Sequence, residues 1–304
     1  MVVFLTSLRH PDSSNDYGQV LTLFERTARS VCSQTNPNLA FVVSCNEIPD
    51  IPFKDDRIHY HKVDFPIPCH QDGDIPLDEM PTAGTSDRVK RDKGSKLLSG
   101  LLYMRDNLSA EYVYIIDADD WVNNCVVEHM LAAPRHPVWC ADSGYLVNNV
   151  TKRMKKRYGI TRYCGSTFAY QRDYLLSLTT FAEGLDGSSS QRELIEGTSK
   201  YYVYEVCGDH SNTFEYAKKQ GVTPKSFPFP AISWVVETGE NVSRSSGGDQ
   251  GMPVNAERLR AFGLPDDMLN NESPELSTMF YESLSGARSR VTWWLTKFSG
   301  KKYY

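Results

Sequence analysis

The chain has 304 residues, of which 40% are hydrophobic and 23% charged, and its formal net charge is −5. These values are typical of a globular protein with a substantial core, and the negative charge argues against a general nucleic-acid-binding protein. The seven cysteines lack the paired spacing of a disulfide framework or zinc site, and no stretch approaches the roughly 18 apolar residues of a membrane span. We therefore expect reduced thiols in a cytoplasmic protein.

The first sixty residues predict a β-α-β arrangement. Residues 2–6 are expected to form an apolar strand and not a signal peptide, because no basic residues precede them. Asn15 or Asp16 can cap a helix over 18–33. Two further strands are expected over 39–44 and 57–63. Such an opening predicts parallel strands joined by a right-handed crossover.

The rest of the chain alternates between short elements and segments rich in Pro, Gly and Asp. A long surface loop is expected over 64–86, and a mobile segment over 239–255. Asp92 can cap a helix over 93–108 that leads into a strand over 112–116. Later expected elements are a strand over 138–150, a helix over 172–178, a Gly/Ser loop over 182–193, a helix over 210–220, a strand over 232–237 and a helical, polar C-terminus.

The most informative stretch is the apolar run that ends in Asp117, Asp119 and Asp120. In an open α/β sheet, ligands bind beyond the carboxyl ends of the strands. Carboxylates within one turn repel each other unless a cation or hydrogen-bond donors lie between them, and such oxygens suit Mg²⁺ or Mn²⁺. One interpretation is a divalent-metal site for a phosphorylated ligand. The other is an Asp-rich turn whose side chains satisfy local backbone donors, and this stretch alone does not decide between them.

The order of motifs along residues 2–245 resembles nucleotide-sugar-dependent glycosyltransferases of the GT-A fold. The motifs are a helix end with the Ser-x-x-x-Gln-Thr pattern, a basic helix start, an Asp-x-Asp strand end, a glycine turn and a late acidic residue, carried here by residues 30–35, 93–96, 117–119, 164–166 and 208–210. The resemblance is greatest to the large inverting family of bacterial polysaccharide biosynthesis, with rhamnosyltransferase relatives. It implies a mixed, mostly parallel Rossmann-like α/β sheet with helices on both faces and a C-terminal helical extension.

The resemblance also implies a division of the chain. A GT-A domain over 1–245 would comprise a nucleotide-binding half at about 1–122 and an acceptor half at about 123–245, and a mobile loop with a helical extension would follow over 246–304. The donor would contact Asp117, and the metal, Mn²⁺ or Mg²⁺, would bind Asp119 with Asp117. The other residues carried over for nucleotide-sugar binding are Thr6, Arg9, Asn46, Lys93, Lys96 and Ala118.

On the acceptor side, the resemblance makes Asp209 the general base, and Glu205 is the reserve candidate. Asp209 also reads as an ordinary helix N-cap, and the two interpretations stay open. Gly165 and Ser166 would let backbone approach the sugar, although a plain turn explains them nearly as well. Trp121 or Trp234 would stack on a sugar ring, although core packing is commoner. Two departures from the family pattern are Gly208 in place of an acidic residue and the absence of His in residues 237–241.

We therefore expect a hexosyltransferase-type enzyme that moves a sugar from a nucleotide-diphosphate donor to a saccharide or lipid-linked acceptor, with inversion and metal assistance. The alternatives are a non-catalytic sugar-nucleotide-binding protein and a nucleotidyltransferase. A nucleotidyltransferase is expected to have a glycine-rich phosphate-binding loop after the first strand, and residues 5–11 contain no glycine. The basic run over 152–157 reads first as a solvated loop face and second as a peripheral contact with the inner face of a membrane.

Overall fold

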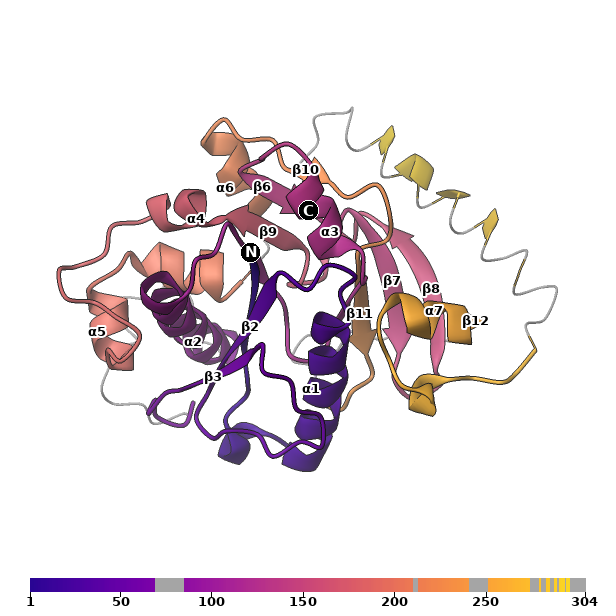
Figure 1. Ribbon diagram of the computed structural model, residues 1–304, viewed down its shortest axis with the longest axis horizontal. Helices are drawn as coiled ribbons and strands as arrows, with labels where there is room; N and C mark the ends of the chain where they lie inside the picture. Colours follow the sequence, from indigo (N-terminus) through magenta and orange to yellow (C-terminus); the bar gives the residue numbers. More distant parts are fainter. Residues whose placement is uncertain are drawn as a thin grey trace.

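The computed structural model describes residues 1–68, 85–209, 213–240 and 251–273, and single helical positions between 279 and 295. Figure 1 shows a central sheet with helices on two sides and a second sheet beside it, formed largely from the middle of the chain. In the part of the chain so described, none of the helices combines the length and apolar character that crossing a membrane requires.

The first sheet contains seven strands among the described residues, in the order β10-β6-β9-β4-β1-β2-β3. Strands β3, β2, β1 and β4 run parallel, β9 is antiparallel to β4 and β6, and β10 is parallel to β6. The strands are β1 (Val2–Ser7), β2 (Leu39–Cys45), β3 (Ile58–Lys62), β4 (Tyr112–Ile115), β6 (Val138–Cys140), β9 (Phe168–Gln171) and β10 (Lys225–Ser226). Strands β1, β2 and β4 are almost wholly buried, as expected of parallel strands covered on both faces.

Helices α1 (Tyr17–Cys32) and α2 (Thr85–Asn107) cover opposite faces of this sheet (Figure 1). Asp16 caps α1 by accepting a hydrogen bond from the Gln19 backbone N–H. The buried side of α1 includes Phe24, which packs with Phe41 of β2. The buried side of α2 packs Leu97 and Leu101 against the other face. The expected fold class, a mixed and mostly parallel α/β sheet with helices on both faces, is confirmed.

A second sheet, which the sequence analysis did not anticipate, has the order β12-β8-β7-β11-β5. Its strands are β5 (Trp121–Val122), β7 (Ser143–Asn148), β8 (Arg153–Tyr158), β11 (Ile232–Val236) and β12 (Met252–Pro253). Helix α7 (Ala256–Ala261) lies beside this sheet, and Leu259 of that helix joins Val147, Met154 and Val235 in a small third core. The two sheets are linked at the acidic turn, because β4 and β5 lie on either side of residues 117–120.

Several expected boundaries are corrected by the structure. Helix α2 begins at Thr85 and not at Lys93, so Asp92 lies inside the helix and is not its cap. The expected strand over 138–150 is two strands, β6 and β7, and the basic run is a strand, β8, and not a loop. Most of the loop expected over 64–86 and of the segment expected over 239–255 lies outside the described residues.

The remaining described elements are short. They are η1 (Pro11–Ser13), α3 (Val126–Ala132), η3 (Ile160–Arg162), α4 (Arg172–Ser177), α5 (Gln191–Glu196), the π-helix η4 (Tyr202–Cys207), α6 (Thr213–Lys219) and η5 (Asp266–Met268). Of these, η4 bears most directly on the site, because it packs along α2 and ends just before Asp209. The division of the chain at residues 122 and 245 stays a prediction.

Candidate functional site

The parallel register of β1, β2 and β4 places the residues that follow them at one edge of the first sheet. Leu5 is level with Ile115, and Ser7 is level with Ser44. The acidic turn over 117–120 therefore lies beyond the same edge as Thr6, Arg9 and Asn46. This edge is where an open α/β sheet binds ligands, and it is the candidate site.

The three aspartates of the acidic turn have different environments. Asp117 and Asp119 are half-buried, whereas Asp120 is 1% exposed. The Asp120 carboxylate accepts hydrogen bonds from Ser166 Oγ at 2.5 Å, the Val235 N–H at 2.9 Å and Cys164 Sγ at 3.2 Å. Burial, followed by the charges of Asp119 and Asp117, raises the pKa of Asp120. Asp120 is therefore enclosed by the protein itself, whereas Asp117 and Asp119 are the two partly exposed carboxylates of the turn.

Lys93 of α2 compensates the charge of this turn. Its ammonium lies 2.5 Å from Asp117 Oδ1. Burial lowers the pKa of Lys93, but Asp117, Asp119 and Asp120 outweigh that effect and raise it overall. Burial, and then the charge of Asp117, raises the pKa of Asp119 to about 7, although Lys93 and Arg9 act in the opposite direction. The raised pKa values of Asp119 and Asp120 show that full ionisation of the turn is unfavourable beside Lys93 alone, so a further cation would favour the ionised forms.

The acidic turn suits a divalent metal that the ligand helps to coordinate. Among the described residues, no group of three or more His, Cys, Asp and Glu side chains is arranged to hold a metal ion. Asp117 and Asp119 alone are two hard oxygen ligands, and Mg²⁺ is commonly held by one or two carboxylates together with substrate phosphates. The donor set therefore fits Mn²⁺ or Mg²⁺ with the remaining positions supplied by a diphosphate and water.

Helix α2 and the π-helix η4 approach each other through two glycines. A Cβ added at Gly94 would lie 2.0 Å from the Val203 carbonyl oxygen, and one at Gly208 would lie 2.5 Å from the Lys90 carbonyl oxygen. This close contact brings the two acidic candidates for general base to α2. Lys90 Nζ lies 2.7 Å from Asp209 Oδ2 and 3.6 Å from Glu205 Oε1. Asp209 thus follows a helix, and residues 210–212, where a helix was expected to open, lie outside the described residues.

Lys90 and Lys93 connect the two acidic groups. They are one turn apart on α2 and therefore about 5 Å apart along its axis. Lys90 pairs with the acids at the end of η4, and Lys93 pairs with the acidic turn after β4. Beside Lys93 lies a small pocket, lined also by Gly165 and by Ile115, Phe168, Tyr170, Val206 and Cys207. The site thus combines the acidic turn, two lysines on α2, and Gly165, whose lack of a side chain leaves space in the pocket.

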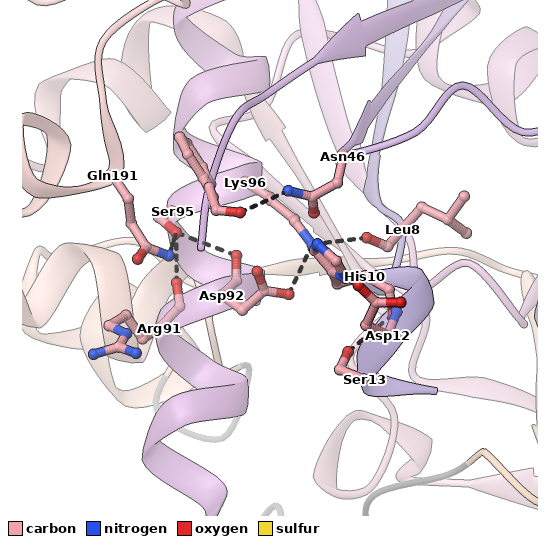
Figure 2. Close-up of polar contacts among 11 residues, drawn as sticks. Leu8, His10, Asp12, Ser13, Asn46, Arg91, Asp92, Ser95, Lys96 and Gln191 are labelled. Carbon is pink, nitrogen blue, oxygen red and sulfur yellow. Dashed lines mark hydrogen bonds and ion pairs between the residues drawn. The ribbon is translucent and has the colours of Figure 1, made fainter. Parts of the chain in front are cut away.

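Lys96 lies in a separate polar cluster at the ends of β1 and β2 (Figure 2). It is fully buried, and its ammonium donates to the Leu8 carbonyl at 3.0 Å and to Asp92 Oδ2 at 2.9 Å. Asn46 donates to the Phe65 carbonyl at 2.9 Å. Four buried side-chain oxygens at this edge have no hydrogen-bond partner among the described residues: Thr6 Oγ1, Ser44 Oγ, Asn46 Oδ1 and Asp92 Oδ1. Thr6 and Ser44 are wholly buried, whereas Asn46 and Asp92 are 9% and 8% exposed, so only the latter two lie near the surface where a polar ligand would satisfy them.

Arg9 forms an ion pair at this edge of the sheet. Its guanidinium lies 2.5 Å from Glu240 Oε2, and Glu240 also accepts from the backbone N–H groups of Asn15 and Asp16. Glu240 therefore fixes the segment after β11 to the segment after β1. The electrostatic influence of Arg9 on Asp119 shows that its positive charge acts on the acidic turn as well.

The remaining predicted residues have mainly supporting positions. The Ala118 carbonyl accepts from Thr27 Oγ1 of α1 at 3.0 Å, which anchors the acidic turn. Ser166 is fully buried, and its hydroxyl accepts from the Asp117 N–H while donating to Asp120. Trp121 is also fully buried and belongs to the third core cluster, so it does not present a ring at the site edge. Trp234, by contrast, is only partly buried.

Sequence reasoning missed Lys90 and Glu240, and it named Asp120 in the acidic cluster without giving it a separate role. Lys90 joins the candidate bases to α2, Asp120 braces the acidic turn, and Glu240 binds Arg9. Lys90 could have been found from its spacing of three from Lys93. Nothing local distinguishes Glu240, because its partner lies 231 positions away.

No protein-family model matches the chain, and no curated protein sequence matches it. Among solved structures, TarS 1–349 of S. aureus has a TM-score of 0.35 and 10% identity, covering 77% of this chain and 60% of that chain. Its complex with UDP-GlcNAc has a TM-score of 0.36, also at 10% identity, covering 81% and 61%. The inositol-1-phosphate CTP transferase of T. maritima has a TM-score of 0.34 and 10% identity, covering 90% and 97%. The chain spans about three-fifths of the TarS fragment. Likenesses of this size extend to the α/β fold alone.

Proposed function

We propose that the protein is a glycosyltransferase that uses a nucleotide-diphosphate sugar and a divalent metal. The observation that supports this most directly is the pair of lysines on α2. Lys93 contacts the acidic turn that would hold the metal, and Lys90 contacts Asp209, the candidate base. A sugar placed between the two would have its leaving diphosphate on one side and an activated acceptor on the other. Neither alternative function requires an acid held opposite the metal turn.

The donor nucleotide would lie along the ends of β1 and β2. The unpaired Oδ1 of Asn46, a residue that is 9% exposed at the end of β2, is suited to a hydrogen bond with a base or ribose, and Thr6 has a role as a buried supporting residue. The diphosphate would then reach Lys93 and Arg9, whose charges favour phosphate oxygens. Asp119 and Asp117 would hold Mn²⁺ or Mg²⁺, which when bound supplies Lewis-acid neutralisation of the departing diphosphate. Lys96 is committed to Asp92 and Leu8, so we assign it a positioning role.

Transfer with inversion would take one displacement. The acceptor hydroxyl oxygen attacks the anomeric carbon, the bond from that carbon to the diphosphate oxygen breaks, and the hydroxyl proton passes to the Asp209 carboxylate. The nucleoside diphosphate leaves with the bonding electron pair. Lys90 favours the ionised form of Asp209 before the reaction, as an adjacent ammonium does for any carboxylate. Glu205, at 3.6 Å from the same ammonium, is the second candidate base.

Donor hydrolysis without an acceptor tests this proposal. Purified protein is incubated with UDP- and GDP-sugars, with and without Mn²⁺, and the released nucleoside diphosphate is measured. We expect Mn²⁺-dependent release that falls about a hundredfold or more in Asp119→Ala, since metal assistance contributes several kcal/mol. Asp56→Asn, at an exposed aspartate away from the site, is the matched control.

Three results would contradict the proposal. Release that is equal in Asp119→Ala and in the native protein would remove the acidic turn from the reaction. Pyrophosphate release from a nucleoside triphosphate, with no release from nucleotide sugars, would indicate a nucleotidyltransferase instead. Binding of nucleotide sugars without turnover in the presence of any acceptor tried would indicate a non-catalytic binding protein.

A further inference from the structure

A stacked set of three side chains lies on one face of the second sheet and has no part in donor binding. The rings of Tyr163 and Trp234 are 6.1 Å apart at an interplanar angle of 10°, and the Arg157 guanidinium lies 4.4 Å from the Tyr163 ring centroid. We call Arg157, Tyr163 and Trp234 the cationic ladder. Tyr163 is 44% exposed, so an aromatic ring that core packing would bury is accessible to solvent.

Strand register explains why the cationic ladder gathers on one face. Arg157 is level with Gly144, and Lys155 and Trp234 are both level with Leu146. Because successive side chains alternate across a strand, Arg157, Lys155 and Trp234 share a face. Lys156 lies on the opposite face of β8, where it is level with Tyr145. The shared face therefore combines two cations with flat aromatic rings.

Asp120 fixes the cationic ladder relative to the acidic turn. Its carboxylate accepts from Cys164 Sγ and from the Val235 N–H, which belong to the residues next to Tyr163 and Trp234. The same carboxylate binds Ser166, which accepts from the Asp117 N–H. One buried group thus joins the metal turn and both aromatic residues. Gly165, which lines the pocket beside Lys93, lies two residues from Tyr163.

We infer that the cationic ladder is the acceptor subsite and that the acceptor is a saccharide carrying negative charge. This inference rests on the proposed glycosyltransferase function and adds the class of acceptor. The apolar face of a sugar ring packs flat on an aromatic ring, as Tyr163 and Trp234 offer. Arg157 offers a planar fork that pairs with a carboxylate or phosphate on the same chain, and Lys155 adds positive charge nearby. A neutral saccharide would pack on the rings and form no ion pair with Arg157.

The test compares two forms of one oligosaccharide. Calorimetric titration measures binding of hexagalacturonate, which carries a carboxylate on every sugar, and of its fully methyl-esterified form. We expect the native protein to bind the charged form at least about tenfold more tightly. Tyr163→Ala and Arg157→Gln should each weaken that binding about tenfold, and Tyr163→Phe should retain it. Lys156→Gln removes the same charge from the opposite face and should leave binding unchanged.

Binding of UDP with Mn²⁺, measured by thermal shift on the same variants, separates this inference from the proposed function. Retained UDP binding in Tyr163→Ala, with lost hexagalacturonate binding, supports the acceptor subsite. The inference is overturned if the native protein does not bind hexagalacturonate at millimolar concentration, or if it binds the ester equally well. If UDP still binds in that case, the proposed glycosyltransferase function is not contradicted. Binding to phosphatidylserine vesicles that Arg157→Gln abolishes, without binding of the saccharide, overturns it in favour of a membrane contact. Absence of binding by both UDP and GDP, each measured with Mn²⁺, contradicts the proposed function itself.

Discussion

Three acidic residues within one turn, Asp117, Asp119 and Asp120, have different physical tasks. Asp120 is surrounded by donors from β11 and from the turn over 164–166, whereas Asp119 is half-buried beside Asp117. A carboxylate that already accepts three hydrogen bonds inside the protein contributes to stability. A carboxylate with excess neighbouring negative charge costs stability until a cation arrives. The residue type is the same, and the neighbours decide the role.

This difference predicts that substitution of Asp120 lowers the stability of the fold much more than substitution of Asp119 does. Asp120→Ala should lower the free energy of unfolding by about 3 kcal/mol, because the Val235 N–H and the Ser166 hydroxyl lose a buried partner and a cavity remains. Asp119→Ala should change it much less. Urea unfolding of both variants in metal-free buffer measures the contrast. Equal decreases in the free energy of unfolding of the two variants would show that the hydrogen bonds of Asp120 do not stabilise the fold.

The two candidate bases can be separated by conservative substitutions. Asp209→Asn should reduce turnover about a hundredfold or more and leave the affinity for nucleoside diphosphate unchanged, because the shape is kept and the proton acceptor is lost. Glu205→Gln should retain most of the activity. Turnover assays combined with nucleotide titration distinguish the effects. The reverse pattern, with Glu205→Gln inactive, would make Glu205 the base.

At the scale of elements, α2 organises the site. It carries Lys90, Lys93 and Lys96 on successive turns, and each lysine has its partner on a different element. The π-helix η4 lies against it at backbone contact distance, and π-helical turns occur frequently at functional sites. Gly94 and Gly208 permit that approach because any side chain at either position would meet a backbone carbonyl.

The close packing of α2 against η4 predicts that one methyl group added at Gly94 has a large effect on stability. Gly94→Ala should destabilise the fold by about 2 kcal/mol or more, because the added Cβ would lie 2.0 Å from the Val203 carbonyl oxygen. It should also move Asp209 away from Lys90 and reduce turnover. Gly18→Ala, in the first turn of α1, is the control and should be neutral or slightly stabilising. Chemical denaturation and turnover assays test both; an unaffected Gly94→Ala would mean that α2 and η4 are not closely packed.

At the scale of the whole molecule, a half-buried histidine gives the fold a dependence on pH. His61 of β3 bridges to α2, with Nε2 at 2.7 Å from Ser99 Oγ and 2.9 Å from the Gly187 carbonyl. Burial lowers the pKa of His61, although the Gly187 hydrogen bond acts in the opposite direction. His61 therefore stays neutral in the folded protein at a pH where the unfolded chain binds a proton. Its contribution is complete above the ordinary pKa and is lost as pH falls through that value toward the folded one.

Comparison of variants isolates this contribution from the carboxylates. The free energy of unfolding should decrease less between about pH 8 and about pH 5 in His61→Gln than in the native protein. Urea titrations at the two pH values provide the measurement, and His59→Gln, two positions earlier on β3, is the control. An identical decrease in His61→Gln and the native protein would show that His61 titrates alike in both states.

The sequence alone was sufficient for the four parallel strands β1 to β4 of the main sheet and for its first helix. The apolar runs predicted β1, β2 and β4 within one residue at most ends, and Asp16 was one of two expected caps of α1. These features are local, since an apolar run or a cap depends on a few neighbouring residues. The same patterns located the acidic turn at the strand edge. The start of α2 and the strand β8 were missed because polar and basic residues gave no apolar periodicity there.

The roles of individual residues were decided by tertiary structure. No local pattern separates Asp120 from Asp119, buried Trp121 from partly exposed Trp234, or Lys96 from Lys93. In each pair the outcome depends on partners from distant segments, such as Val235 for Asp120 and Leu8 for Lys96. Burial and charge compensation are properties of the packed chain, so the sequence determined which elements form and where acids cluster. Only the fold determined which acids remain available to bind a ligand.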